Sequence, residues 1–237
     1  MLRKTMRKYL YALTSKICEN CTKEYRCSHG YRFYACLEDF WWLEAGHYEP
    51  LTTSFLSSNL REGDMAIDVG AHIGIHTIHM ASIAKFVVAI EPERLNFSLL
   101  KRNIVLNNLK NVVAVPAALS DRDGSAELCV ERSTGLHSLE PSADCLRVVK
   151  VKTFTLDTLL KILGFSRVDL LKIDVEGHEF EVLKGARNTL ANNPPRFIVI
   201  ETWPTSKALQ MLQEIGYEFI KVLDRHGFYA NFALKYD

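Results

Sequence analysis

The residues Met65-Ala66-Ile67-Asp68-Val69-Gly70-Ala71-His72-Ile73-Gly74 decide the fold of this chain. A short apolar run ends in an acidic residue and a glycine turn, and apolar residues at helical spacing follow. This pattern predicts a buried strand, a ligand-binding loop and the first turn of a helix. In such a loop, Gly70 and Gly74 allow the backbone to approach a ligand where a Cβ atom would intrude.

The ligand predicted for this loop is a nucleoside without phosphates. His72 stands where dinucleotide-binding loops have their middle glycine, so a pyrophosphate cannot lie as close to the helix N-terminus. S-adenosylmethionine is therefore the obvious candidate. About 20 residues beyond the turn, Glu91 closes a second apolar run, where a carboxylate can accept hydrogen bonds from ribose hydroxyls.

Length and composition are those of a globular protein. The chain has 237 residues, of which 48% are hydrophobic and 24% charged, and this suits one α/β domain with additions. A net charge of +1 does not favour nucleic acid as a partner. No apolar run reaches the roughly 18 residues of a membrane span, and the N-terminus lacks the features of a secretory signal. We therefore expect a cytoplasmic protein.

The N-terminal region differs from the rest and is expected to be an extension over residues 1–44, with the main domain at 45–237. It begins with a basic amphipathic helix and then carries most of the cysteines. A structural zinc ion is one hypothesis, and disulfides or free thiols are the alternatives, although a cytoplasmic protein is expected to lack structural disulfides. The candidate zinc ligands are Cys18, Cys21, Cys27, and His29 or Cys36.

Strands and helices alternate along most of the remaining chain. A third strand over 112–115 is followed by an inserted antiparallel pair over 125–130 and 148–154. Two more core strands and a terminal hairpin complete the pattern. It predicts an α/β fold with a doubly wound sheet, mostly parallel and with a C-terminal antiparallel strand.

Polar residues gather where the predicted strands end. Asp174, Glu176, His178 and Glu179 follow the fourth strand within six residues, and Glu201 closes the fifth. Such clusters of ionisable groups mark chemistry more often than packing. After the third strand, the small side chain of Ala118 leaves room for an adenine ring, because ligands of parallel sheets lie at the carboxyl ends of the strands.

The motifs together resemble the FkbM family of S-adenosylmethionine-dependent methyltransferases, over roughly residues 45–203. The similar stretches are Ile67–Gly74, Glu91-Pro92, Gly135–Leu139, Thr155–Asp157, Lys172–Glu179 and Leu183–Ala186. His72 departs from this family, which usually has Asn there, but it can still form hydrogen bonds. The resemblance implies the Rossmann-like fold of class I methyltransferases. It also implies methyl transfer to a hydroxyl of a small molecule, with a sugar, lipid or polyketide-like compound as acceptor.

Residue roles follow from the motifs and the resemblance. The cofactor-binding residues expected are Asp68, Gly70, Ala71, His72, Gly74, Glu91, Ala118 and Asp174. A base must take the proton of the acceptor hydroxyl, and His178 is the first choice because its ordinary pKa suits neutral pH. Glu176 and Glu201 are the alternatives. A divalent metal bridging these acids to a diol is chemically sensible, but the sequence requires none.

Two other functions remain open. Residues 102–107 resemble a stretch of archaeal tRNA guanine-N1 methyltransferases, which makes an RNA methyltransferase possible on sequence grounds. The segment after the fourth strand does not match the motif that holds a flipped base. A non-catalytic binding protein with the same fold is the second alternative, and the intact acidic residues speak against it.

Overall fold

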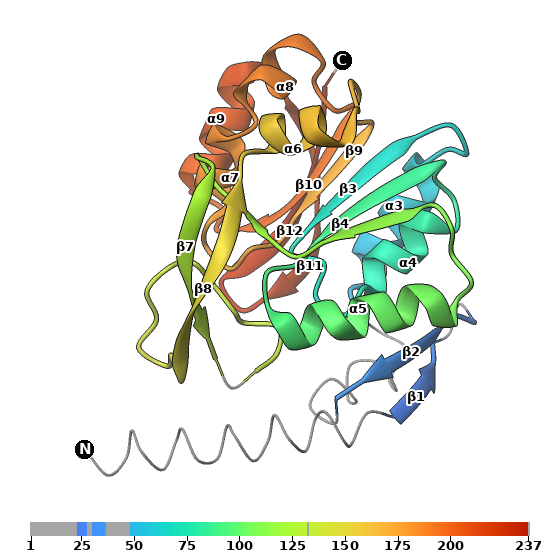
Figure 1. Ribbon diagram of the computed structural model, residues 1–237. Helices are drawn as coiled ribbons and strands as arrows, with labels where there is room; N and C mark the ends of the chain where they lie inside the picture. Colours follow the sequence, from blue (N-terminus) through green and yellow to red (C-terminus); the bar gives the residue numbers. More distant parts are fainter. Residues whose placement is uncertain (1–22, 28–29, 37–47, 132, 237) are drawn as a thin grey trace.

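A computed structural model describes residues 23–27, 30–36, 48–131 and 133–236 of the chain. Its centre is a twisted seven-stranded sheet (Figure 1). All strands of this sheet run parallel except β12, which lies antiparallel between its two neighbours. In spatial order the strands are β11 (Glu218–His226), β12 (Tyr229–Lys235), β10 (Phe197–Thr202), β9 (Leu170–Ile173), β3 (Met65–Val69), β4 (Phe86–Ile90) and β5 (Val112–Val115).

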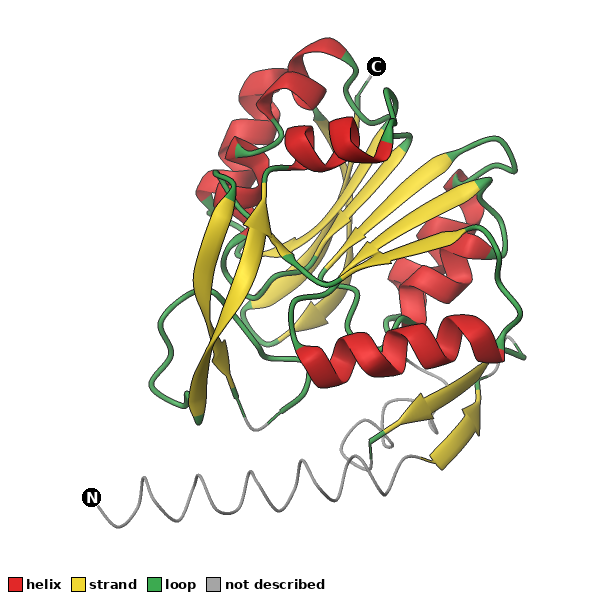
Figure 2. Cartoon of the chain, in the orientation of Figure 1, coloured by secondary structure: helices red, strands yellow, loops and turns green. Residues whose placement is uncertain are grey.

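Helices cover both faces of the sheet, as Figure 2 shows. Successive side chains of each central strand point to opposite faces of the sheet. Ile67 joins the apolar cluster beneath the later helices, whereas its neighbour Ala66 joins the cluster with Phe55 and Met80. One face carries α3 (Pro50–Asn59), α4 (Ile75–Ala81) and α5 (Arg94–Leu106), and the other carries α6 (Leu156–Leu163), α7 (Glu179–Lys184), α8 (Arg187–Asn192) and α9 (Lys207–Ile215). The predicted doubly wound sheet with an antiparallel C-terminal strand is confirmed.

The segment inserted between β5 and α6 forms a sheet of its own. Its strands are β6 (Ala118–Leu119), β7 (Gly124–Val130) and β8 (Arg147–Phe154), in the order β6-β8-β7. The long pair β7–β8 is antiparallel, as the sequence predicts, and β6 adds to it in parallel. This small sheet carries residues 133–146 toward the carboxyl ends of the central strands.

The chain before α3 contributes a hairpin of β1 (Lys23–Arg26) and β2 (Arg32–Ala35). It packs on α5, where the Tyr34 amide donates to the Asn103 side chain over 2.6 Å. The predicted helix over 1–17 lies outside the described residues, and the boundary at residue 44 stays a prediction. No helix among the described residues is both long and apolar enough to cross a membrane.

Candidate active site

A cavity of about 760 Å³ opens at the carboxyl ends of the parallel strands. Its walls come from the loops after β3, β4 and β9, from the carboxyl end of β10, from residues 48–50 at the start of α3, and from the inserted segment. The end of β11 and the start of β12 complete them. This volume is in the range of small-molecule and cofactor sites. The predicted site residues that line the cavity are Gly70, His72, Glu91, Ala118, Asp174, Glu176, His178 and Glu201.

The glycine turn after β3 is built as predicted, but its glycines serve contacts within the protein. Gly70 has φ +79°, and a Cβ atom there would meet the Asp174 carbonyl oxygen at 1.7 Å. Gly74 has φ +92°, and a Cβ atom there would meet the Leu100 side chain at 2.6 Å. The glycines therefore allow the turn to pack against β9 and α5. Gly74 does not itself line the cavity.

Asp68 lies beneath the turn and does not reach the large cavity. It is 1% exposed, and its Oδ2 atom accepts a hydrogen bond from the Thr77 hydroxyl over 2.5 Å. Its Oδ1 atom is buried without a hydrogen-bond partner among the described residues. Asp68 and Ala71 line a small hollow beside the cavity, which Gly70, His72 and Asp174 share with it. An orphaned carboxylate oxygen here fits a ligand that donates hydrogen bonds.

Glu91 closes β4 at the cavity wall. One carboxylate oxygen accepts from the His72 amide over 2.9 Å, and the other accepts from the Glu93 amide over 2.8 Å. Burial raises the pKa of Glu91 to about 8 in spite of these two bonds. The acidic end of β4 thus contacts the glycine turn directly, which is the arrangement predicted for a nucleoside site.

Three carboxylates from neighbouring strand ends meet inside the cavity. Asp174, Glu176 and Glu201 each place an oxygen within 4.8 Å of the others. Burial, followed by the charge of Asp174, raises the pKa of Glu176 to about 8 and that of Glu201 to about 11. The buried Lys172 neutralises part of this charge through an ion pair with Asp174 over 2.9 Å.

His178 lines the cavity at the start of α7, but both of its ring nitrogens contact the protein. Nε2 lies 3.0 Å from the Ser120 hydroxyl, and Nδ1 lies 2.7 Å from Glu140 of the inserted segment. The imidazole is therefore fixed in orientation. A substrate hydroxyl could reach a ring nitrogen only by replacing one of these partners.

Backbone strain is concentrated around the cavity. Four described residues other than glycine have positive φ, and three of them, Glu49, His72 and Glu176, line the cavity. Each such conformation costs of order 1–3 kcal/mol and is retained where the surroundings impose it, often at functional sites. The strain in Glu176 and His72 supports their assignment to the site.

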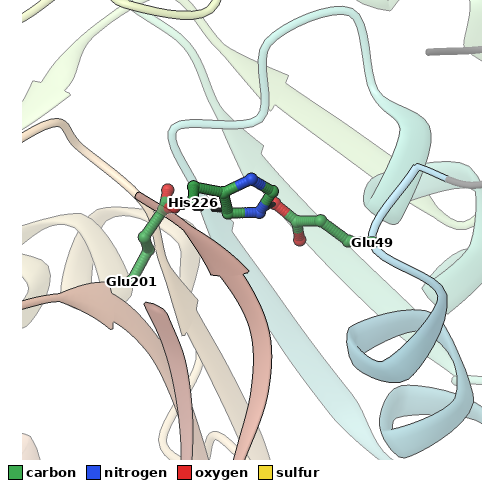
Figure 3. Close-up of side chains that lie close together, drawn as sticks. All are labelled: Glu49, Glu201 and His226. Atoms are coloured by element: carbon green, nitrogen blue, oxygen red, sulfur yellow. Dashed lines mark ion pairs between the residues drawn. The ribbon is translucent and has the colours of Figure 1, made fainter. Parts of the chain in front are cut away.

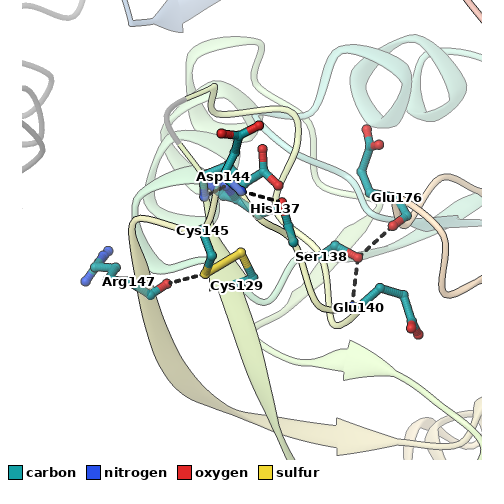
Figure 4. Close-up of a disulfide and its surroundings, with 10 residues drawn as sticks. Cys129, His137, Ser138, Glu140, Asp144, Cys145, Arg147 and Glu176 are labelled. Carbon is teal, nitrogen blue, oxygen red and sulfur yellow. Dashed lines mark hydrogen bonds between the residues drawn. A yellow bond between two sulfur atoms is a disulfide. The ribbon is translucent and has the colours of Figure 1, made fainter. Parts of the chain in front are cut away.

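The inserted segment forms one wall of the cavity. Figure 4 shows its disulfide and the contact of Ser138 with Glu176. The Ser138 hydroxyl donates to the Glu176 carbonyl oxygen over 2.6 Å and thus joins this wall to the end of β9. A disulfide between Cys129 and Cys145 closes the base of the segment. The expectation that the chain lacks structural disulfides is wrong for this pair, because β7 and the start of β8 bring the two thiols together.

The predicted zinc site is not supported. Cys18, Cys21 and His29 lie outside the described residues, and neither Cys27 nor Cys36 belongs to a disulfide among the described residues. Within the described ranges, no group of potential metal ligands contains a cysteine. Cys36 is buried in an apolar cluster with Phe33 of the hairpin, which accounts for it as a packing residue.

Sequence reasoning missed a second polar group at the cavity wall. Glu49 precedes α3 and is 4% exposed, and its carboxylate contacts His76 over 2.8 Å and His226 over 3.4 Å. Burial alone would raise the pKa of Glu49, but hydrogen bonds from His226 and His76 lower it well below its ordinary value. The Glu49-Pro50 pair is the only local signal for this residue, since Pro is common in the first turn of a helix.

Aromatic side chains form an exposed lip beside the cavity. Tyr229 lines the cavity, and its ring centroid lies 4.6 Å from that of Trp203. Trp203 in turn stacks on Phe228, which is 80% exposed. An exposed group of large aromatic residues next to a cavity is typical of a binding surface.

Comparisons with known proteins agree with this geometry. The family model described as the methyltransferase FkbM domain matches residues 68–219. The hexuronic acid methyltransferase AglP of Haloferax volcanii is 27% identical over 169 residues, covering 70% of this chain and 66% of AglP. The methyltransferase sdnD of Sordaria araneosa is 29% identical over 186 residues, covering 63% of this chain and 70% of sdnD.

A crystal structure of a methyltransferase FkbM from Methylobacillus flagellatus has the same fold. It aligns with a TM-score of 0.54 at 17% identity, covering 75% of this chain and 44% of that one. This chain thus spans about two thirds of AglP and less than half of the crystallised protein. The class I methyltransferase fold predicted from the sequence is confirmed. Since the family model covers more than half of the chain, the protein belongs to the FkbM methyltransferase family.

Proposed function

We propose that this protein uses S-adenosylmethionine to methylate a hydroxyl group of a sugar or another small polyol. The observation that carries the proposal is the contact between Glu91 and the His72 amide at the cavity wall. It joins the acidic end of β4 to the glycine turn after β3, and these are the two elements that a nucleoside needs in a doubly wound sheet.

The residues present fit this cofactor. Glu91 offers carboxylate oxygens to ribose hydroxyls. The small side chains of Ala117 and Ala118 leave space beside it for an adenine ring. Asp174 and the orphaned oxygen of Asp68 offer acceptors for an ammonium group in the small hollow. When bound, the cofactor supplies a methyl group that its sulfonium charge already activates.

The protein then has to hold the acceptor in line and take its proton. Glu176 is our first choice for the base, because its carboxylate lies in the cavity and its pKa of about 8 is close to neutral. His178, the first choice from the sequence, now ranks second, because both of its ring nitrogens already contact other side chains. Glu201 is the third candidate, since it lies within 4.8 Å of Glu176 and Asp174.

Charge and shape favour a neutral polyol as acceptor. Six acidic side chains line the cavity, and Arg225 is the only Arg or Lys among its described lining residues, so the cavity offers little attraction to a polyanion such as RNA. The acidic residues are Glu49, Glu91, Asp174, Glu176, Glu201 and Asp224. The aromatic lip at Trp203 and Tyr229 offers a flat apolar surface to a sugar ring. The relative AglP is named a hexuronic acid methyltransferase, which agrees with a sugar as acceptor, although a hexuronic acid carries a carboxylate that a neutral polyol lacks.

The first experiment is calorimetric titration with S-adenosylmethionine and with S-adenosylhomocysteine. Micromolar binding of both is expected, followed by methyl transfer in a screen of sugars and polyols. Binding of neither to the folded protein would refute the cofactor assignment. Binding without turnover on any hydroxylated compound would favour a non-catalytic role, and turnover on tRNA alone would refute the proposed acceptor class.

A further inference from the structure

A histidine and two carboxylates from distant parts of the chain meet at the cavity wall (Figure 3). The imidazole of His226, at the end of β11, lies between Glu49, which precedes α3, and Glu201 in β10. Its Nε2 atom is 3.4 Å from Glu49 Oε1 and 4.0 Å from Glu201 Oε1. Methyl transfer as proposed above assigns no role to Glu49 or His226.

The spacing of these atoms suits a metal ion. One ligand atom from each residue lies within 4.8 Å of the other two. An ion bound at roughly 2.0–2.2 Å from each atom places neighbouring ligands about 3–3.6 Å apart, so only small side-chain movements are needed. His76 contacts the second oxygen of Glu49 over 2.8 Å, and such an outer contact orients a ligating carboxylate.

Asn231 provides an independent sign that a partner belongs here. It is 0% exposed, and neither its side-chain oxygen nor its nitrogen has a hydrogen-bond partner among the described residues. It lies directly opposite Glu201 in the antiparallel pairing of β10 and β12, so both side chains project from the same face of the sheet. A fully buried amide without partners calls for an ion or water beside it.

We propose that Glu49, Glu201 and His226 bind a divalent transition-metal ion, with the Asn231 amide beside it as a further oxygen ligand. Two carboxylates and one imidazole favour a first-row ion such as Mn²⁺ or Fe²⁺ over Ca²⁺, which takes oxygen ligands alone. The ion supplies positive charge where the cavity gathers carboxylates.

The position of the ion suggests what it does. Glu49, Glu201 and His226 all line the cavity, so coordination positions left open face the space in which the acceptor would lie. Two adjacent oxygen atoms of the acceptor, such as those of a vicinal diol or a hydroxy acid, can occupy them. This role toward the acceptor rests on the proposed function, whereas binding of the ion does not.

The test is titration of the chelator-treated protein with Mn²⁺, with free Mn²⁺ followed by electron paramagnetic resonance. We expect one ion per chain. Glu49→Gln, Glu201→Gln and His226→Ala should each weaken binding at least about tenfold. His226 is 40% exposed, so its replacement removes little packing, and circular dichroism checks the fold of every variant.

Matched controls come from the same cavity. Glu91→Gln removes one acidic group and His137→Gln removes one imidazole, and each should change Mn²⁺ affinity less than about threefold. Three outcomes would overturn the proposal: no binding at millimolar Mn²⁺, equal weakening by the controls, or loss of binding in Glu176→Gln with normal binding in His226→Ala. Parallel titration with S-adenosylhomocysteine tests the proposed function separately.

Discussion

The Nδ1 atom of His178 lies 2.7 Å from the carboxylate of Glu140, which joins the start of α7 to the inserted segment. Its other ring nitrogen faces Ser120 at 3.0 Å, so the imidazole connects two layers of the protein. With Nδ1 against a carboxylate, Nε2 is the nitrogen that could take a proton, and the Ser120 hydroxyl occupies it. The same contacts that fix His178 thus make Glu176 the better candidate for taking a proton from the acceptor.

We therefore expect Glu176→Gln to lower turnover at least 100-fold, the usual loss when a general base is removed. His178→Gln, which keeps a polar side chain at the same place, should lower turnover less than about tenfold. Both variants should bind S-adenosylhomocysteine as the unmodified protein does. Turnover would be measured as S-adenosylhomocysteine released with an acceptor from the screen. A larger loss of turnover in His178→Gln than in Glu176→Gln would identify His178 as the base.

The pH dependence of turnover gives a second test of Glu176. Burial raises its pKa to about 8, so its carboxylate is mostly protonated at pH 6 and ionised above pH 8. Turnover at saturating substrate should rise over this interval and level off above it. A profile that levels off near pH 6.5 would fit an imidazole base instead.

Glu91 is expected to govern cofactor affinity. Glu91→Gln should weaken S-adenosylhomocysteine binding at least tenfold, about 1.4 kcal/mol, because Gln has one oxygen where Glu91 has two to contact the ribose hydroxyls and the backbone amides. Asp68→Ala should also weaken binding tenfold. It should in addition lower the melting temperature, since it leaves the buried Thr77 hydroxyl without its acceptor. Calorimetry measures the loss of affinity, and thermal unfolding measures the loss of stability. Unchanged affinity in both variants would refute the assignment of the cofactor site.

Much of this site could be predicted from local patterns. Asp68, Glu91, Asp174 and Glu201 each follow an apolar run, and parallel strands gather their carboxyl ends at one edge of the sheet. The turn at Gly70 was predicted correctly, but the reason for the glycine was not. A Cβ atom added there would clash with the backbone of Asp174 rather than with a ligand. That contact depends on the pairing of β3 with β9, which no local pattern contains.

The residues that the sequence did not predict contact partners that lie far from them along the chain. Glu49 and His226 meet only because α3 packs beside β11, and neither position has a periodic or motif-like neighbourhood. Cys129 and Cys145 pair only because β7 and β8 are in register, as in the pairing of Cys129 with Val148. Sequence spacing gave no reason to join them, since their loop carries no secondary-structure signal.

Stability is expected to be greater at pH 5 than at pH 8. The pKa of Glu91 is about 8 in the folded protein, against an ordinary value of 4.5, so only the unfolded chain loses this proton between those values. The stability that the protonated group contributes is thus lost as pH rises toward 8, at up to about 1.4 kcal/mol per pH unit. Glu179, whose pKa burial raises to about 7, acts in the same direction.

Urea unfolding at several pH values measures this slope, and Glu91→Gln is the matched variant. Its stability should depend less on pH between 5 and 8 than that of the unmodified protein, whatever its absolute value. The side chain is 5% exposed, so solvent screens the effect only slightly. Parallel curves for the two proteins would show that Glu91 is ionised in the folded state throughout this range.

The disulfide should stabilise both the inserted sheet and the cavity wall. Cys129 and Cys145 are 16 residues apart, and closing a loop of that length is worth about 3 kcal/mol in the chain-entropy account. Reduction should therefore lower the melting temperature by several degrees. It should also weaken S-adenosylhomocysteine binding, since residues 133–137 of the closed segment line the cavity.

The control for this prediction is the double variant Cys129→Ser/Cys145→Ser, which should melt like the reduced protein and ignore added reductant. Cys27 and Cys36, which belong to no disulfide among the described residues, stay in place in this variant. If the melting temperature of the double variant still falls on reduction, then other cysteines of the chain cause the change. If reduction changes the melting temperature but not ligand affinity, then contacts other than the disulfide hold the segment in place, among them the Ser138 hydrogen bond to the Glu176 carbonyl oxygen and the contact of Glu140 with His178.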